Sequence, residues 1–241
     1  MGRGVAAGTM TVFLLLLLPG PASAQRVDIF TALQQGTVLA EFRGNGDASV
    51  TGTITRLPGG PTEVVIPVGS VFRVAQAGRG WNQWGPGGFP GGFSGPGGGY
   101  MGGRGGFGQF GGRQGMFGLS STTTRLAFNN SAEILIPTVC MDYGKPAPTP
   151  QDVLVILPPN GPVLTRLADL LSTTSFPQPA VQIAMWAMVD KAPKVAALRY
   201  LEEIIPGRTP AIARQRAELL DTARQIVEQV GLSPAALPMF R

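Results

Sequence analysis

A glycine-rich segment, residues 78–118, most constrains what this chain can fold into. Twenty of its 41 residues are glycine, and it contains no acidic residue, valine, isoleucine or threonine. Ordering glycine costs more backbone entropy than ordering any other residue, so the segment has little to offset the cost of packing. Strand-like sequence lies on both sides of it. The sequence therefore predicts a long flexible loop inserted into a β-rich domain, not a linker between domains.

The first 24 residues have the features of a cleavable secretory signal. Arg3 supplies a positive start, residues 12–18 are apolar but too few to span a bilayer, and small residues precede a cleavage site between Ala24 and Gln25. An uncleaved N-terminal anchor is the alternative. We expect a mature chain without a transmembrane segment, located in the periplasm, at the cell surface or outside the cell.

The glycine-rich segment carries aromatic and basic side chains that are candidates for binding. They are Trp81, Trp84, Phe89, Phe93, Tyr100, Arg104, Phe107, Phe110 and Arg113. Three interpretations stay open: an insertion without a specific partner, an adhesive region that stacks on glycans, envelope polymers or other copies of itself, or an RNA-binding element. The third rests on the RGG-like stretch that begins at Arg104, and export disfavours it because single-stranded nucleic acid is scarce outside cells.

Histidine is absent, and this absence excludes several kinds of chemistry. Without it there is no Ser-His-Asp or Cys-His catalysis and no His-ligated zinc. The acidic residues are scattered, and charge is nearly balanced outside the glycine-rich segment, which argues against a nucleic-acid-binding face. The single cysteine, Cys140, excludes an intrachain disulfide. We predict a non-catalytic protein without a cofactor or metal, and an unrecognised hydrolase remains an alternative.

Residues 25–157 are predicted to form an antiparallel Ig-like β-sandwich. Short alternating runs separated by turns indicate strands near residues 38–42, 49–55, 63–66 and 71–74, with Val50, Gly52 and Ile54 on one face. After the glycine-rich segment, residues 122–128 and 132–139 form two more strands joined by a tight turn. Residues 153–157 form a further strand or a buried connection.

Residues 158–241 are predicted to form a small helical bundle that packs on the sandwich, which makes the fold class α+β. The expected helices begin at Pro162, Ala180, Pro193 and Pro210, and Thr209 caps the last of them. Helical spacing in the third helix places four apolar side chains inward: Val195, Leu198, Leu201 and Ile205. On the fourth helix, Arg214 is expected to pair with Glu218 and Arg224 with Glu228.

Cys140 ends a predicted strand, and about forty residues later comes the run Val181-Gln182-Ile183-Ala184-Met185-Trp186. This arrangement resembles the bacterial thioester (TQxA) surface domains, in which a cysteine-containing strand precedes a Thr-Gln-x-Ala-x-Trp helix. The resemblance implies covalent adhesion through a cysteine–glutamine thioester, with Cys140 and Gln182 as candidates. Val181 replaces the family's threonine, and the family's bond-forming glutamine lies in a later strand, where this chain is predicted to be helical.

Two plainer interpretations of Cys140 stay open: a buried small side chain, and a free thiol that pairs between molecules. The chain is also similar to uncharacterised exported bacterial proteins with a strand-rich half followed by helices, and that similarity implies no activity. The residues together favour an exported, non-catalytic binding or structural protein that contacts an envelope polymer, a glycan or another surface protein through its glycine-rich segment.

Overall fold

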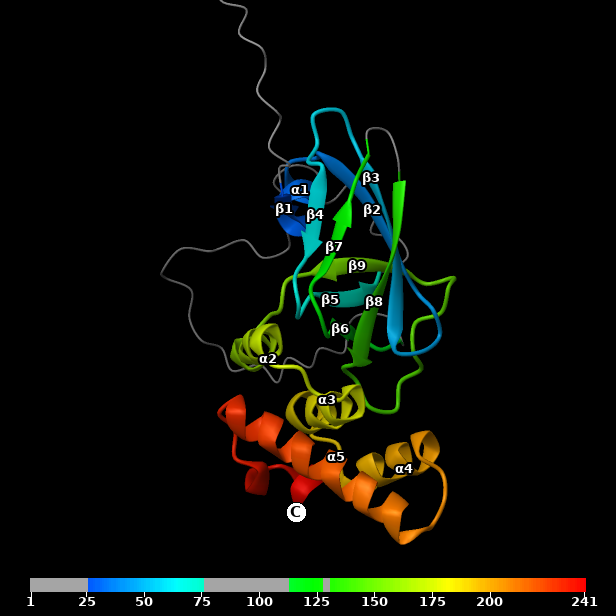
Figure 1. Cartoon of the computed structure of the whole chain (residues 1–241), viewed down its shortest axis with the longest axis vertical. Helices are drawn as coiled ribbons and strands as arrows, with labels where there is room; N and C mark the ends of the chain where they lie inside the picture. Colours follow the sequence, from blue (N-terminus) through cyan, green and yellow to red (C-terminus); the bar gives the residue numbers. More distant parts are fainter. Residues whose placement is uncertain (1–25, 76–112, 128–130) are drawn as a thin grey trace, which may run out of the picture.

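The computed structural model describes residues 26–75, 113–127 and 131–241. The predicted signal and its cleavage site between Ala24 and Gln25 lie outside the described residues. So do eight of the candidate contact residues, namely Trp81, Trp84, Phe89, Phe93, Tyr100, Arg104, Phe107 and Phe110. Figure 1 shows the strands gathered in one part of the molecule and the C-terminal helices gathered at one end of it.

A closed six-stranded antiparallel barrel forms the centre of the fold. Around the barrel the strands follow the order β2 (Val38–Gly44), β3 (Ser49–Arg56), β8 (Ser131–Cys140), β6 (Met116–Gly118), β5 (Val71–Val74) and β9 (Val153–Leu157). β9 closes the barrel because it pairs on one side with β5 and on the other with β2, where Leu154 lies opposite Phe42.

A small mixed sheet lies beside the barrel. β4 (Glu63–Ile66) pairs in parallel with β1 (Arg26–Asp28) and antiparallel with β7 (Thr122–Arg125). A short helix, α1 (Ile29–Gln34), follows β1 at once. Its first turn is capped by Asp28, whose Oδ1 accepts hydrogen bonds from the backbone N–H groups of Phe30 (2.8 Å) and Thr31 (3.4 Å).

The predicted Ig-like sandwich is wrong, because the strands close into one barrel instead of forming two facing sheets. Alternating strands with short turns are compatible with either arrangement, and closure depends on which strands become neighbours. β9, at residues 153–157, closes the sheet into a barrel, since it pairs with both β2 and β5. The predicted hairpin of residues 122–128 and 132–139 is also wrong, because β7 pairs with β4 while β8 pairs with β3 and β6.

The barrel interior follows the predicted alternation along β3. Val50, Gly52 and Ile54 are all buried, while Thr51 and Thr53 are exposed on the outer surface. The largest side chains of this core include Phe42, Phe72, Met116, Ile136 and Leu154, which come from five different strands. The period-2 pattern therefore identified the inward face of β3, although the partner strands were assigned to the wrong architecture.

The C-terminal part contains α2 (Pro162–Thr173), α3 (Gln178–Met185), a π-helical turn η2 (Trp186–Asp190), α4 (Lys194–Ile204), α5 (Pro210–Gln229) and two short 3-10 turns, η3 (Pro234–Ala236) and η4 (Pro238–Phe240). α3 lies centrally and packs against both β8 and α5 (Figure 1). The predicted bundle on a sandwich is therefore replaced by helices that meet the end of a barrel through α3. None of the helices in the described part of the chain combines the length and the apolar character needed to cross a bilayer.

The predicted inward face of α4 is wrong for two of its side chains. Leu201 is fully buried, but Val195 is 48% exposed and Leu198 is 42% exposed. On α5, Thr209 caps the first turn as predicted, with its Oγ1 accepting a hydrogen bond from the N–H of Ile212 at 3.3 Å. Arg224 pairs with Asp221 at 3.5 Å instead of with Glu228.

Gly52 marks a point where the barrel core allows no side chain. A Cβ atom at this position would lie 2.8 Å from the ring of Phe42 and 3.0 Å from Cγ1 of Ile134. We expect Gly52→Ala to lower the free energy of unfolding by about 1–3 kcal/mol, because the buried ring must move. Thr53→Val, one residue along and exposed, is the matched control and should change stability by less than about 0.5 kcal/mol. Urea unfolding of both variants measures the difference, and equal stability would contradict this packing.

Candidate functional site

The two strands that flank residues 76–112 are neighbours in the barrel. β5 and β6 are neighbouring antiparallel strands, with Val71 opposite Phe117 and Phe72 opposite Met116. Residues 76–112 therefore connect two adjacent strands of the same barrel. The last three residues of the predicted glycine-rich segment form β6, and Phe117 is a buried core residue.

Arg113, the one candidate contact residue within the described part of the segment, is engaged with the barrel. Its Nε lies 3.4 Å from Oδ2 of Asp152, and its Nη1 donates to the carbonyl oxygen of Ala147 at 3.5 Å. Asp152 also accepts hydrogen bonds from the backbone N–H and the hydroxyl of Thr149, both at 2.7 Å. The backbone bond from Thr149, with help from the Thr149 hydroxyl and Arg113, lowers the pKa of Asp152.

The buried carboxylate of Asp142 holds the residues that lead into β6. Asp142 accepts a hydrogen bond from the N–H of Gly115 through Oδ2 (2.8 Å) and from Lys145 Nζ through Oδ1 (3.2 Å). Arg73, from β5, is buried nearby. Burial lowers the pKa of the Arg73 guanidinium, and the Asp142 carboxylate opposes that shift. Arg73 lies in the strand before residues 76–112, and Asp142 is bonded to Gly115, which follows them. These two charged groups thus fix this end of the barrel.

Gln182 joins the helices to the barrel through the backbone of Cys140. Its Oε1 accepts from the N–H of Cys140 at 2.8 Å, and its Nε2 donates to the carbonyl oxygen of the same residue at 2.7 Å. One turn earlier on α3, Gln178 Nε2 donates to the carbonyl oxygen of Thr138 at 2.9 Å. These two side-chain amides continue the hydrogen bonding of β8 beyond its last residue paired with β3, Pro137.

Cys140 and Gln182 are therefore in contact, and the contact runs through the backbone of Cys140. Burial raises the pKa of the Cys140 thiol to about 11, and the carboxylates of Asp142 and Asp47 add to the effect. The thiol is accordingly protonated at neutral pH and is a weak nucleophile in this environment.

An aromatic cluster lies beside this joint. The Trp186 ring makes edge-on contacts with Tyr143 (centroids 5.3 Å apart) and Tyr200 (5.2 Å apart). Trp186 is only 8% exposed, and its Nε1 finds no hydrogen-bond acceptor among the described residues. Burial, together with the nearby Cys140 and Glu203, raises the pKa of Tyr200 to about 12. These rings pack the joint between the barrel and the helices.

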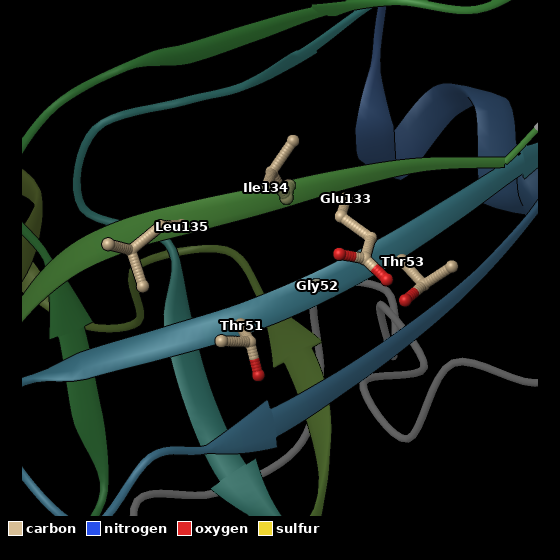
Figure 2. Close-up of a pocket in the computed structure, with 6 residues that line it drawn as sticks. All are labelled: Thr51, Gly52, Thr53, Glu133, Ile134 and Leu135. Carbon is tan, nitrogen blue, oxygen red and sulfur yellow. The ribbon is translucent and has the colours of Figure 1, made fainter.

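The outer face of the barrel carries a shallow hollow that was not predicted from the sequence. It has a volume of about 490 Å³ and is lined by Thr51, Gly52, Thr53, Glu133, Ile134 and Leu135. Figure 2 shows these residues along the neighbouring strands β3 and β8. The one sequence signal for it is a leucine, Leu135, at an outward position of a strand.

The hydrogen bonds and the ion pair of Asp142, Gln114 and Arg113 hold residues 113–115 against the barrel. Within residues 26–75, 113–127 and 131–241, no three His, Cys, Asp or Glu side chains converge to bind a metal ion. Comparisons with protein-family models, with curated proteins and with solved structures gave no match. The function must therefore be inferred from the geometry alone.

The amide of Gln182 offers a direct test of how the two parts are joined. We expect Gln182→Met to lower the free energy of unfolding by about 2–4 kcal/mol, because it leaves the N–H and carbonyl of Cys140 unpaired while keeping the side-chain volume. Gln178→Met removes one hydrogen bond at an exposed position and should cost about 0.5–1.5 kcal/mol. Thermal unfolding of the two variants gives the comparison. Equal losses of stability in the two variants would show that the two hydrogen bonds of Gln182 stabilise the fold no more than the single bond of Gln178 does.

Proposed function

We propose that this protein is an exported, non-catalytic binding protein of the cell envelope or the extracellular space, and that its glycine- and aromatic-rich segment is the contact region. The observation that carries the proposal is the buried carboxylate of Asp142 bonded to the N–H of Gly115. It lies where the segment re-enters the barrel, next to the buried Arg73 of the strand from which the segment departs.

Residues 113–115 make more side-chain contacts with the barrel than a simple connection between two strands requires. Two neighbouring antiparallel strands can be joined by a turn of about two residues. Here the connection is far longer, and its return uses a buried Asp142, an ion pair from Arg113 to Asp152 and a side-chain hydrogen bond from Gln114 to the carbonyl oxygen of Lys145. Long loops presented by a rigid scaffold are common binding elements.

The composition of the segment points to the kind of partner. It supplies seven aromatic residues besides Phe117 and no acidic residue. Aromatic rings present large apolar faces, and the apolar faces of sugars can stack on them. An envelope glycan is therefore the partner class to test first, with another surface protein as the alternative.

The binding test uses insoluble cell-wall glycan and the chain from Gln25 to Arg241. In one variant the seven rings are replaced by serine, at Trp81, Trp84, Phe89, Phe93, Tyr100, Phe107 and Phe110. We expect co-sedimentation of this variant to weaken at least about tenfold, since several stacking contacts are lost together. The control Leu39→Ser/Leu135→Ser changes exposed apolar side chains of the barrel and should sediment as the unchanged protein does.

A second variant separates the segment from the fold. Replacing residues 78–110 with a linker of about six residues keeps β6 and the Asp142–Gly115 bond, because the strands are already adjacent. This variant should fold, as judged by circular dichroism, and should not sediment with the glycan. Retained sedimentation by both segment variants would reject the proposal and place the contact on the folded surface.

A thioester-type adhesion module is the second candidate, favoured by the contact between Cys140 and Gln182. Sγ of Cys140 would bond to Cδ of Gln182, the amide C–N bond would break, and the thiol proton would leave with the nitrogen as ammonia. Both amide hydrogen bonds to the Cys140 backbone must break before this step.

Intact mass decides between a thioester and a plain thiol. Because the pKa of the Cys140 thiol is raised to about 11, we expect the mature protein to show its full mass and to take up one alkylating group after unfolding. A mass lower by one ammonia, followed by the gain of one whole methylamine on treatment and the release of a free thiol, would establish the thioester instead. Cys140→Ser is the control for both outcomes.

A further inference from the structure

β7 lies beside β8, but no strand pairing joins the two in the described part of the chain (Figure 1). β6 pairs with β8 as far as Gly118, which lies opposite Thr138. One more hydrogen bond follows, from the N–H of Leu119 to the carbonyl oxygen of Pro137 at 2.9 Å. The chain then leaves β8, and β7 pairs with β4. The first part of β8 therefore has β3 as its neighbour on one side and, among the described residues, no paired strand on the other.

Glu133 and Leu135 direct their backbone N–H and C=O groups away from β3. Successive residues of an antiparallel strand direct these groups to opposite sides, so every second residue faces the same neighbour. Thr138 faces the β3 side, since its N–H donates to the carbonyl oxygen of Ala48 at 2.9 Å. Pro137 faces β6 instead, and the alternation then directs the groups of Leu135 and Glu133 to that side as well.

Thr123 and Arg125 of β7 face away from β4 in the same way. The N–H of Leu126 donates to the carbonyl oxygen of Thr62 at 2.8 Å, which continues the pairing of β7 with β4. Alternation from Leu126 directs every second residue to β4 and leaves the backbone groups of Thr123 and Arg125 on the opposite side. The other long strand that β7 contacts is β8.

The register that β6 has with β8 would bring these residues opposite one another. When it is continued, Thr123 lies opposite Glu133 and Arg125 lies opposite Ser131. The two surfaces match as well, because these four residues are exposed and the residues between them are half-buried on both strands. This register differs from the tight hairpin predicted from the sequence, since it leaves residues 126–130 between the paired stretches.

Charge favours the same register. The side chain of Arg125 is 92% exposed, and its Nε lies 3.9 Å from Oε2 of Glu63, so this ion pair contributes little stability. Glu133 forms no ion pair with a described residue. In the continued register Glu133 is the diagonal neighbour of Arg125, at a backbone separation of about 7–8 Å that long side chains span.

We propose that residues 121–125 and 131–135 form a seam with two states, unpaired as in this structure and paired in the register of β6. In the paired state each pair of facing residues gains two backbone hydrogen bonds, and β7 keeps β4 on its other side. The small sheet and the barrel then form one continuous sheet. β6 and β7 become a single strand along β8, whereas β6 alone pairs with β8 over only three residues. The state of the seam thus determines how firmly the strand that follows residues 76–112 is held.

Disulfide trapping tests the paired state in the chain from Gln25 to Arg241 carrying Cys140→Ser. Thr124→Cys/Ala132→Cys places two thiols at directly opposite positions, where the Cα atoms of the paired state are about 4.5 Å apart. Thr122→Cys/Ala132→Cys is the matched control, shifted by two residues along the same face of β7. Oxidised glutathione accepts the two electrons and two protons of the thiols. We expect the first pair to form its disulfide at least about tenfold more readily than the control, measured by mass and by thiol count.

Hydrogen exchange measures the bonds of the seam directly. In the trapped protein, the N–H groups of Thr123 and Glu133 should exchange at least about tenfold more slowly than in the reduced form, because each gains an acceptor. The N–H groups of Thr122 and Ile134 already face β4 and β3, so their exchange should change less and serves as the internal reference.

A proline blocks the seam and leaves the ladder between β3 and β8 intact. Glu133→Pro removes an N–H that faces away from β3, and Pro137 already occupies a position of the same orientation in β8. This variant should fold, as judged by circular dichroism, and should lower disulfide formation by the Thr124→Cys/Ala132→Cys pair at least about fivefold. Thr123→Pro makes the same block from β7 if the first variant does not fold. Equal oxidation of the two cysteine pairs, a disulfide without slower exchange at Thr123 and Glu133, or no effect of the proline would overturn the proposal.

Discussion

The pairing of the Gln182 amide with the Cys140 backbone is the contact on which the arrangement of the whole molecule depends. β8 is bonded to β3 only as far as Pro137, and on that side its last residues would otherwise leave N–H and carbonyl groups unpaired. Gln178 and Gln182 supply those bonds from α3. Because buried backbone groups require partners, a helix with amides four residues apart is fixed at this strand end. The remaining helices then pack on α3 and its neighbours.

Local structure could be read from the sequence, whereas the closure of the sheet could not. Alternation identified Val50, Gly52 and Ile54 as inward, and the capping residue Thr209 located the start of α5. Barrel closure depends on β9 pairing with both β2 and β5, strands far from it along the chain. No periodicity in a single strand encodes its partners. β6 was missed because its three residues end a glycine-rich stretch whose composition argues against a strand.

The sequence selected two residues of the candidate site, Cys140 and Gln182. It selected them through the thioester resemblance, not through the hydrogen bonds that the structure shows. The thioester resemblance selected Cys140 and Gln182, and the structure brings them together through hydrogen bonds to the backbone. Asp142 and Arg73, which anchor the segment, were not identified, although each carried a signal. Arg73 interrupts an apolar strand, and Asp142 lies two residues after the end of another strand. A charged residue in a buried position usually has a structural or functional partner.

α4 shows why helical spacing does not decide which face is inward. Its apolar residues occupy more than half of its circumference, so spacing selects Val195, Leu198, Leu201 and Ile205 together. The small side chains Ala196 and Ala197 are the ones that allow the close approach to the core, and Val195 and Leu198 are displaced to the surface. Spacing ranks all of these apolar positions alike, so the inward face of α4 is decided by the helices and strands that it meets, and these favour its alanines.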